Sequence, residues 1–269
     1  MKLVSLLILI VFLTITAGCN NSCPETTLLN AHSHNDYEQG RPLLDALDYG
    51  FCSVEADVFF DGNDLMVAHD KDDIQPGRTL ENLYLKPLWQ RYEENGAIQP
   101  GCDEFMLLID FKHGGKDIYN CLKRQLDKYQ KMLTRLEDGK IMPGKVIICI
   151  SGARPISIMQ NENDRPCFLD GRPDQLNDPG KYPLSLMPLV SDAIYNYIKL
   201  NKNANTPSDL LDEDRIMKVI EQCHQQGRKI RFWALPNATG SWAKALQLNI
   251  DYINTDDLKG LNAFLIEQK

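Results

Sequence analysis

Short apolar runs that resemble β-strands alternate with segments of helical periodicity along almost the whole chain. About eight such runs can be recognised: Thr27–Ala31, Ser53–Phe60, Phe105–Phe111, Val146–Ile150, Cys167–Leu169, Leu186–Val190, Lys229–Leu235 and Tyr252–Asn254. This alternation predicts a parallel sheet covered by helices. Eight units within about 250 residues fit a single (β/α)8 TIM barrel. A doubly wound open sheet is the competing architecture.

The helical segments lie between these runs. The predicted helices are Pro42–Tyr49, Leu80–Asn95, Asp117–Glu137, Asp209–Gln226, Ser241–Leu248 and Leu261–Glu267. Gly50, Gly96 and Gly227 follow three of them directly, at the position where glycine commonly ends a helix. No loop between the segments has the composition of a domain boundary, so residues 27–269 are predicted to form one barrel domain.

Side chains that could take part in catalysis or binding lie at or near the carboxyl ends of the predicted strands: His32, Glu55, Asp57, Asp110, Lys112, Arg154, Trp233 and Asp256. An open sheet would concentrate such residues at one crevice. A barrel instead gathers residues from many strand ends at one mouth. Their spread over separate strands therefore favours the barrel.

Four of these residues are carboxylates, and three of the four belong to neighbouring strands. Glu55 and Asp57 are two residues apart on one strand, so both side chains project from the same face. Asp110 ends the next strand and adds a third hard oxygen ligand. Such a set suits Mg²⁺ or Ca²⁺ better than zinc, because no cysteine and few histidines accompany it. We expect a divalent metal at Glu55, Asp57 and Asp110.

Histidines flank the acidic cluster. The chain has only five, and His32, His34 and His69 lie beside the acids in the predicted barrel. His32 and His69 could exchange protons with a nucleophile and a leaving oxygen, as general acid–base catalysis requires. These two are the predicted catalytic residues, and His34 is predicted to contact the substrate.

Three further side chains are predicted to contact the substrate. Lys112 is two residues after Asp110 and points to the same face, where it could neutralise an anionic oxygen. Arg154, just after a strand, could bind a phosphate bidentately. Trp233 at another strand end could form a wall of the pocket.

The net charge argues against one class of partner. The formal charge is −8 and the isoelectric point is about 5.2, so non-specific binding to nucleic acid is not expected. An anionic substrate would have to be attracted locally, by a metal or a few basic side chains.

The N-terminus is predicted to be a targeting segment. Met1-Lys2 is followed by an almost unbroken apolar run and then by Thr16-Ala17-Gly18-Cys19. Residues 1–18 therefore read as a lipoprotein-type signal peptide and residues 19–26 as a tether. In this interpretation Cys19 carries the lipid, and the protein is exported and anchored to a bacterial membrane at the periplasmic side or the cell surface. A plain signal peptide and an uncleaved anchor are the alternatives.

The other cysteines show no CxxC pair, so zinc-ribbon and thioredoxin-like sites are not expected. Seven remain when Cys19 is set aside, an odd number that leaves at least one thiol free. Cys52 and Cys149 lie in apolar strand-like runs and are predicted to be small buried hydrophobes.

Several motifs together resemble one superfamily. The segments are HSHNDY (32–37), SVEADV (53–58), SGARP (151–155), DGRPDQL (170–176), MPLVSD (187–192), RFWALPN (231–237) and INTDDL (253–258). In this order they resemble the glycerophosphodiester phosphodiesterase and phosphatidylinositol-specific phospholipase C-like superfamily. Within it, the closer likeness is to the altered-inheritance-of-mitochondria protein 6 family.

The resemblance implies a TIM barrel that cleaves a phosphodiester of a small molecule or lipid. It implies a metal on Glu55, Asp57 and Asp110, and acid–base roles for His32 and His69. Two positions depart from the pattern. The superfamily has His-Arg-Gly at the first strand end, whereas this chain has His32-Ser33-His34, and the third acid, usually glutamate, is the shorter Asp110.

Two other functions remain open from the sequence. His32-x-His34 could be a metal pair of the kind found in amidohydrolase-like enzymes or histidinol-phosphatase-like phosphoesterases, although those sites use more histidines than this chain offers nearby. The chain could also be a non-catalytic surface lipoprotein that binds glycan or lipid head groups.

Overall fold

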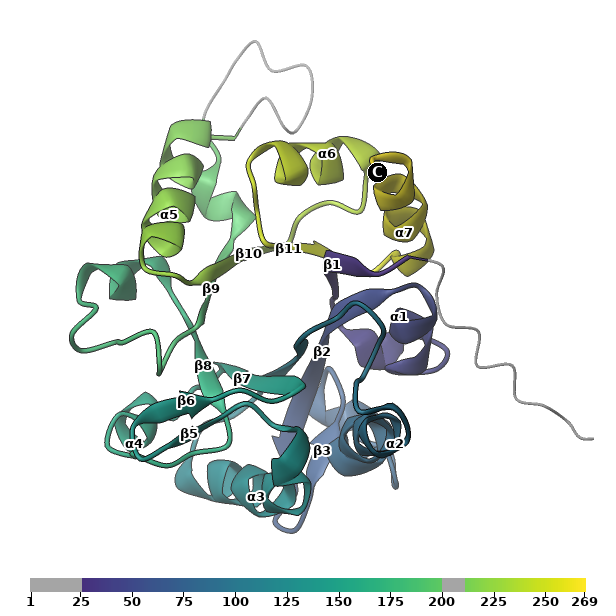
Figure 1. The fold of residues 1–269 in the computed structure, drawn as a ribbon, viewed down its shortest axis with the longest axis vertical. Coiled ribbons are helices and arrows are strands. Elements are labelled where there is room, and N and C mark those ends of the chain that lie inside the picture. Colours follow the sequence, from purple (N-terminus) through teal and green to yellow (C-terminus); the bar gives the residue numbers. More distant parts are fainter. Residues whose placement is uncertain (1–25, 200–210) are drawn as a thin grey trace, which may run out of the picture.

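Eight parallel strands close into a barrel in the computed structural model, which describes residues 26–199 and 211–269. The strands are β1 (Leu28–Ser33), β2 (Phe51–Phe60), β4 (Phe105–Phe111), β7 (Val146–Gly152), β8 (Phe168–Gly171), β9 (Leu189–Ala193), β10 (Lys229–Trp233) and β11 (Tyr252–Thr255). Because β1 pairs with both β11 and β2, the sheet has no free edge within the barrel (Figure 1). The predicted TIM barrel is confirmed, and the open sheet is excluded.

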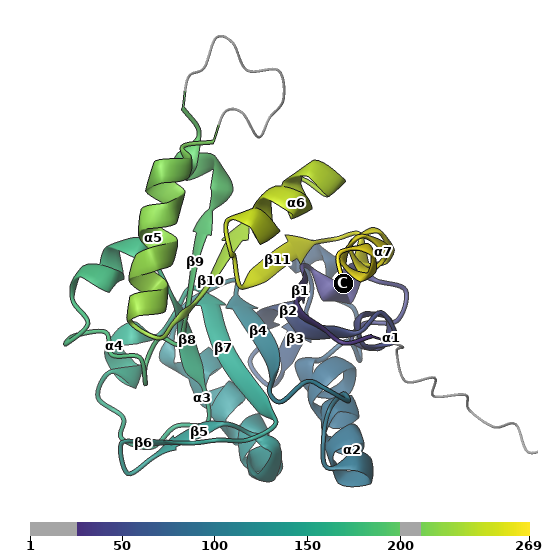
Figure 2. The ribbon, with the colours of Figure 1, turned by 45° about the horizontal axis from the view of Figure 1, so that its top comes forward.

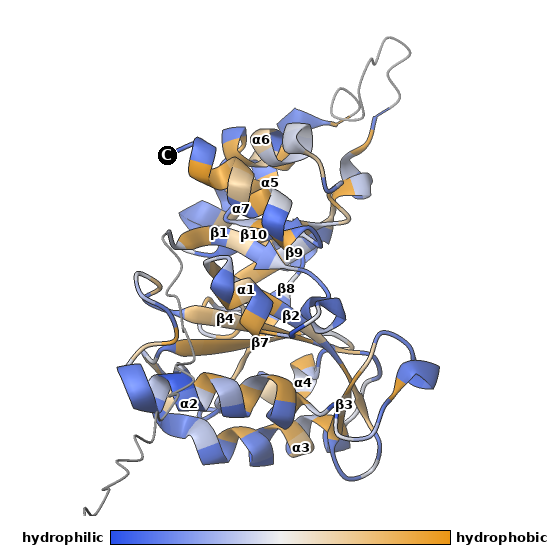
Figure 3. Cartoon of the chain, turned by 90° about the vertical axis from the view of Figure 1, so that its right-hand side faces the viewer, coloured by the Kyte–Doolittle hydropathy of each residue, from blue (hydrophilic) through white to orange (hydrophobic). Residues whose placement is uncertain are grey.

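Helices cover the outside of the barrel: α1 (Leu44–Asp48), α2 (Lys86–Asn95), α3 (Lys116–Leu126), α4 (Ile156–Met159), α5 (Glu213–Gln225), α6 (Thr239–Gln247) and α7 (Leu258–Glu267). A π-helix at Glu81–Leu85 leads into α2. On α3, Ile118, Leu122 and Leu126 are buried against the strands, and burial of each such side chain contributes about 1.5–3 kcal/mol. Figure 3 shows β4 and β7 as largely hydrophobic, whereas the helices present mixed faces. Among the described residues, no helix has both the length and the apolar character needed to cross a bilayer.

The predicted helix at 117–137 is too long. After α3 the chain forms a 3-10 turn at Asp127–Met132 and then a hairpin of β5 (Arg135–Glu137) and β6 (Lys140–Met142). Its two-residue turn is Asp138-Gly139, with φ of 49° and 72°, which is the backbone that an Asp-Gly hairpin turn requires. Figure 2 shows this hairpin at the opposite end of the molecule from α6.

A second hairpin extends β2 beyond the barrel. The Asp61 carboxylate accepts hydrogen bonds from the backbone N–H groups of Asn63 (2.9 Å) and Asp64 (2.8 Å), which closes the turn into β3 (Leu65–Val67). β3 runs antiparallel to the end of β2, with Val58 opposite Val67. This return places His69 beside the carboxyl end of β2.

The barrel interior differs at its two ends. Toward the amino ends of the strands it is filled by an apolar cluster of Met106, Leu108, Ile147, Cys149, Phe168 and Leu189. Toward the carboxyl ends the interior positions become polar. Asp57 lies opposite Asp110 on β4, and Asp110 opposite Ser151 on β7. The side chains capable of catalysis or metal binding therefore lie at the carboxyl ends of the strands, where the active sites of TIM barrels are found.

Cys52 and Cys102 form a disulfide across the barrel's amino end, with Cα atoms 6.0 Å apart. Cys52 is buried, as predicted, but it is not a simple hydrophobe, because a distant loop brings Cys102 beside it and the two are bonded. Cys149 is buried and unpaired, as expected, and so are Cys121, Cys167 and Cys223. Cys19 and Cys23 lie outside the described residues.

Loss of this disulfide should destabilise the protein. It closes a loop with a sequence separation of 50, for which the chain-entropy argument gives about 4 kcal/mol. We expect reductant to lower the unfolding midpoint of the wild type in urea and to have no effect on a Cys52→Ala/Cys102→Ala double variant. A wild-type midpoint that does not respond to reductant would contradict the disulfide.

Candidate active site

A cavity of about 230 Å³ lies at the carboxyl ends of the strands. Its walls come from six of the eight barrel strands or the loops that follow them, together with the segment after β3. The lining residues are His34, Asn35, Glu55, Asp57, His69, Asp110, Lys112, Ser151, Arg172, Arg231 and Trp233. Of the residues predicted to act in catalysis, metal binding or substrate binding, all but His32 and Arg154 line this cavity.

Glu55, Asp57 and Asp110 form one acidic cluster. Each offers a carboxylate oxygen within 4.8 Å of the other two. Glu55 and Asp57 are buried, and Asp110 is partly exposed. Burial, together with the neighbouring charges of Glu55 and Asp57, raises the pKa of Asp110 to about 6. Negative charge in the cluster is thus incompletely balanced by the protein.

This donor set fits a hard divalent cation. In the part of the chain that the structure describes, Glu55 Oε1, Asp57 Oδ1 and Asp110 Oδ2 have no hydrogen-bond partner, and none of them is sealed from solvent. Three converging carboxylate oxygens without thiol or imidazole donors match Mg²⁺ or Ca²⁺ rather than zinc. Gly152 makes room for Asp110: a Cβ there would lie 2.5 Å from Asp110 Oδ1.

His32 does not line the cavity. It is fully buried beneath the cluster, with Nδ1 2.7 Å from Ser53 Oγ and Nε2 2.7 Å from Arg231 Nη1. Arginine can only donate, so Nε2 accepts and Nδ1 carries the proton that is donated to Ser53. Burial and the adjacent Arg231 charge lower the pKa of His32 to about 4. The predicted acid–base role for His32 conflicts with this geometry, because both ring nitrogens are already engaged.

Arg231 joins His32 to the acidic cluster. Its Nη1 also donates to Glu55 Oε2 (2.5 Å) and to Asn254 Oδ1 (3.2 Å). Burial alone would raise the pKa of Glu55, but the adjacent Arg231 charge holds it well below its usual range. Glu55 is therefore a fixed, ionised ligand.

His34 lies in the cavity wall. Its Nδ1 is 2.7 Å from Asp256 Oδ1, and Asp256 is itself held by Asn237, whose Nδ2 donates over 2.9 Å to Asp256 Oδ2. Burial lowers the pKa of His34, but the hydrogen bond and charge of Asp256 outweigh it, and the pKa is raised overall. Nε2 has no partner among the described residues, so it is the nitrogen available to a ligand.

His69 lies on another wall of the same cavity. Its Nδ1 is 3.2 Å from Asp57 Oδ2 and 3.1 Å from the Tyr37 hydroxyl. The Tyr37 hydroxyl donates to the same Asp57 oxygen over 2.6 Å, and Lys112 Nζ lies 2.6 Å from it. Asp57 thus orients His69 by one ring nitrogen, and no described residue pairs with the other.

The two basic residues that were predicted to contact the substrate lie in different places. Lys112 lines the cavity, but Arg154 turns away and donates from Nη1 to the Asp170 carbonyl (2.6 Å) and to Gln175 Oε1 (3.1 Å). Arg172 and Arg231 line the cavity and were not predicted. A signal for Arg231 was available: it lies in the apolar run KIRFWAL, two residues before Trp233, and so shares its face. Trp233 lines the cavity as predicted.

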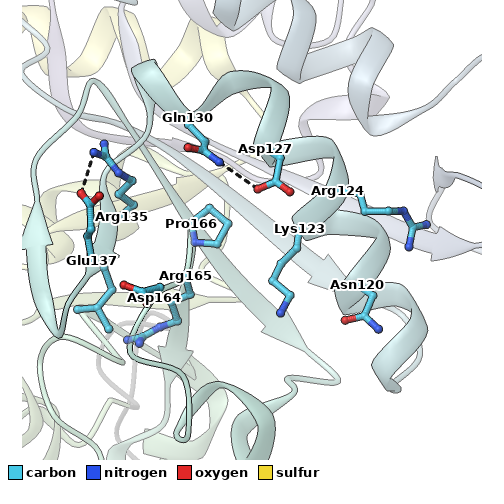
Figure 4. A pocket seen from close by; sticks show the side chains of 11 residues that line it. Asn120, Lys123, Arg124, Asp127, Gln130, Arg135, Glu137, Asp164, Arg165 and Pro166 are labelled. Carbon is cyan, nitrogen blue, oxygen red and sulfur yellow. Dashed lines mark hydrogen bonds and ion pairs between the residues drawn. The ribbon is translucent and has the colours of Figure 1, made fainter.

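A larger pocket, of about 600 Å³, lies near the amino ends of the strands (Figure 4). It is formed by α3, β5 and the segment just before β8. Its charged side chains have both signs, and Arg135 pairs with Glu137. None of the predicted site residues lines it, and it lacks a cluster of the kind found at the other end, so the smaller cavity is the candidate active site.

The sequence of this chain matches a known protein family. The sequence profile of the AIM6-like phosphodiesterase domain matches residues 22–100 and 93–170. The chain is 25% identical to the "Altered inheritance of mitochondria protein 6" of Eremothecium gossypii over 270 residues, covering 88% of this chain and 69% of that protein. It is 30% identical to the protein of that name from Kluyveromyces lactis, covering 89% and 73%.

Solved structures share the fold. A glycerophosphodiester phosphodiesterase from Parabacteroides distasonis superposes with a TM-score of 0.54 at 14% identity, covering 89% of this chain and 97% of that one. A calcium-dependent phosphoinositol-specific phospholipase C from a Gram-negative Pseudomonas species gives 0.58 at 13% identity, covering 85% and 89%. At such identities the likeness shows the fold alone.

The relatives correct the predicted localisation. They are proteins of yeasts and other fungi, which are eukaryotes, whereas the N-terminal pattern had predicted attachment to a bacterial membrane. The bacterial, lipid-anchored localisation is therefore wrong. The predicted signal peptide, Cys19 and the start of the tether lie outside the described residues.

Proposed function

The chain belongs to the AIM6-like phosphodiesterase family, and from this premise we propose that it is a metal-dependent phosphodiester hydrolase. One observation carries the proposal. Three carboxylates with free oxygens share a cavity with His34 and His69, and each histidine is held by an aspartate through Nδ1. A cation site between two oriented imidazoles is what cleavage of a phosphorus–oxygen bond by acid–base catalysis requires.

Glu55, Asp57 and Asp110 would hold the divalent metal, Mg²⁺ or Ca²⁺. When bound, such an ion supplies positive charge that polarises the phosphoryl group. The chain's own contribution is to fix the ligands. Arg231 holds Glu55, and Tyr37 and Lys112 hold Asp57.

The two histidines divide the proton transfers. His69 takes the proton of the attacking hydroxyl, whose oxygen forms the new bond to phosphorus. His34 gives its proton to the leaving alkoxide as the old phosphorus–oxygen bond breaks. Asp256 favours the protonated form of His34, which suits the acid. The catalytic pair is therefore His34 and His69 in place of the predicted His32 and His69.

The substrate proposed is a small-molecule or lipid phosphodiester of the glycerophosphodiester or phospholipid head-group kind. A cavity of about 230 Å³ has room for a phosphate and one small alcohol, with Trp233 at its wall. When water attacks, the products are a phosphomonoester and an alcohol. When a hydroxyl next to the ester attacks, the first product is a cyclic phosphate.

Metal removal tests the proposal directly. We expect purified protein to cleave at least one member of a panel of glycerophosphodiesters, lysophospholipids and inositol phospholipids. EDTA should abolish the activity, and Mg²⁺ or Ca²⁺ should restore it, because the bound ion supplies the positive charge that polarises the phosphoryl group. Activity that persists in EDTA would contradict the metal site. A panel without any cleavage would favour the non-catalytic head-group-binding alternative.

The alternative metal pair receives no support from the geometry. His32 is sealed below the cavity and bound to Ser53 and Arg231, while His34 Nδ1 is bound to Asp256. In the described part of the chain, neither imidazole belongs to a group of three or more side chains placed to hold a metal ion.

A further inference from the structure

Positive charge enters the cavity from a side of the barrel that carries none of the acids. Glu55, Asp57 and Asp110 stand on the neighbouring strands β2 and β4. Arg231 stands on β10, and Arg172 directly follows β8. In the strand order β8 and β10 flank β9, across the barrel from β2 (Figure 1). The cavity therefore has a negative half and a positive half.

Arg231 is almost wholly buried, with 3% of its surface exposed. Its Nε donates to Ser191 Oγ over 3.3 Å, and its Nη1 is shared by His32, Glu55 and Asn254. Nη2 has no hydrogen-bond partner among the described residues, and it is not completely shielded from solvent. One edge of a rigidly held guanidinium therefore faces the cavity.

Arg172 is held in a similar way from the next face of the cavity. Its Nη1 donates to Asp170 Oδ2 over 2.8 Å and to the Gly171 carbonyl over 2.7 Å, and its Nη2 donates to Ser151 Oγ over 3.2 Å. Nε makes no hydrogen bond to the described part of the chain. The buried carboxylate of Asp170 thus fixes the side chain while leaving part of its fork free.

Lys112 cannot supply the same contact. Its Nζ lies 2.6 Å from Asp57 Oδ2 and 3.7 Å from Asp110 Oδ1, so it stands within the acidic half, and an ammonium group lacks the planar fork that binds phosphate oxygens in pairs. Arg172 and Arg231 line the cavity as guanidinium groups, each with N–H donors that have no partner among the described residues.

We propose that Arg172 and Arg231 form a two-arginine clamp that binds the non-bridging oxygens of the substrate's phosphate. This inference rests on the proposed function for the identity of the anion. Guanidinium groups match phosphate oxygens with paired, charge-assisted hydrogen bonds. Because both arginines are held by other side chains, little conformational entropy is lost when the anion binds. The clamp would hold the phosphate against the acidic half, between His34 and His69.

The test measures binding of inorganic phosphate by calorimetry, in EDTA, so that neither turnover nor metal is involved. We expect Arg172→Gln to weaken phosphate binding at least tenfold. Arg154→Gln is the matched control, because Arg154 also donates to the Asp170 carbonyl but does not line the cavity. It should bind phosphate within twofold of the wild type. Equal affinities of the two variants would overturn the clamp.

Two further variants separate a binding role from a structural one. Arg172→Lys keeps a charge beside Asp170 but loses the fork, so it should retain the wild-type unfolding midpoint and still bind phosphate more weakly. Arg231→Lys should also lose affinity, with its folding checked by circular dichroism. A folded Arg172→Lys protein with wild-type affinity would contradict the proposal.

These measurements distinguish failure of the arginine clamp from failure of the proposed phosphodiesterase function. Phosphate binding that depends on Arg172, in a protein that cleaves no diester, would support the clamp and overturn the phosphodiesterase. Cleavage with wild-type KM and phosphate affinity in Arg172→Gln would support the phosphodiesterase and overturn the clamp.

Discussion

Replacing His34 by alanine is expected to lower kcat for a phosphodiester by about 10²–10⁴-fold. His34 is only partly buried, and among the described residues its side chain has one hydrogen-bond partner, Asp256. Its removal therefore deletes the proton donor without opening the core, and the unfolding midpoint should stay near that of the wild type. Steady-state kinetics and thermal unfolding of the same preparation measure both effects.

His69→Ala is the matched variant and should lose kcat to a similar extent. His32→Ala should instead lose stability, by about 2–5 kcal/mol, because it leaves a cavity and unsatisfied buried donors. An H34A enzyme with wild-type kcat would place the proton transfer elsewhere. A His32→Ala protein as stable as the wild type would contradict the buried hydrogen bonds described for that residue.

Asp256 provides a pH test of the same assignment. It raises the pKa of His34, and a general acid must be protonated to act. The rate should therefore fall as pH rises through that pKa. Asp256→Asn removes the main source of the upward shift, so the alkaline limb of the kcat–pH profile should move to lower pH. An unmoved alkaline limb would show that His34 is not the acid.

Replacing Asp110 by asparagine is expected to abolish metal-dependent activity while stabilising the metal-free protein. Its pKa is raised from 3.8 to about 6 by burial and by Glu55 and Asp57. A carboxyl whose pKa is raised in the folded state destabilises that state above the raised pKa. The shift corresponds to at most about 3 kcal/mol, and asparagine removes the charge responsible.

The stabilisation by Asp110→Asn should depend on pH. In EDTA the gain in unfolding free energy of Asp110→Asn should be full above about pH 6, fall as the wild-type carboxyl becomes protonated, and vanish below about pH 4. Urea unfolding across this range measures it. Glu55→Gln is the contrasting variant: it leaves the buried Arg231 charge unpaired and should destabilise the protein by about 3–5 kcal/mol. A destabilised Asp110→Asn protein would contradict the repulsion within the cluster.

The barrel could be predicted from local pattern because each strand and helix carries its own signal. Phe105–Phe111 is a continuous apolar run, and β4 has these same bounds in the structure. The helix predicted over 117–137 failed where long-range contacts overrode a local pattern. Leu133 and Leu136 continue the helical spacing of α3, but tertiary contacts bury them beside Val146 and Arg165. The Asp138-Gly139 pair, which favours a hairpin turn, indicates the structure of this region better than the helical spacing of its apolar residues does.

The acidic cluster could be predicted for a similar reason. The two-residue period of a strand sets Glu55 and Asp57 on one face, and neighbouring parallel strands bring Asp110 beside them. Neither the disulfide partner of Cys52 nor the orientation of Arg154 has such a local determinant. Both depend on which distant side chain completes a contact.

Sequence alone thus determined the barrel, the acidic cluster and the presence of histidines beside it, because strand periodicity and strand order decide which residues share the barrel mouth. Only the tertiary structure decided which histidine has a ring nitrogen available for proton transfer. His32 and His34 are two residues apart, yet Ser53 and Arg231 occupy both nitrogens of the first, while Asp256 engages one nitrogen of the second. Those partners come from β2, β10 and the end of β11, so the availability of each imidazole is a property of the closed barrel.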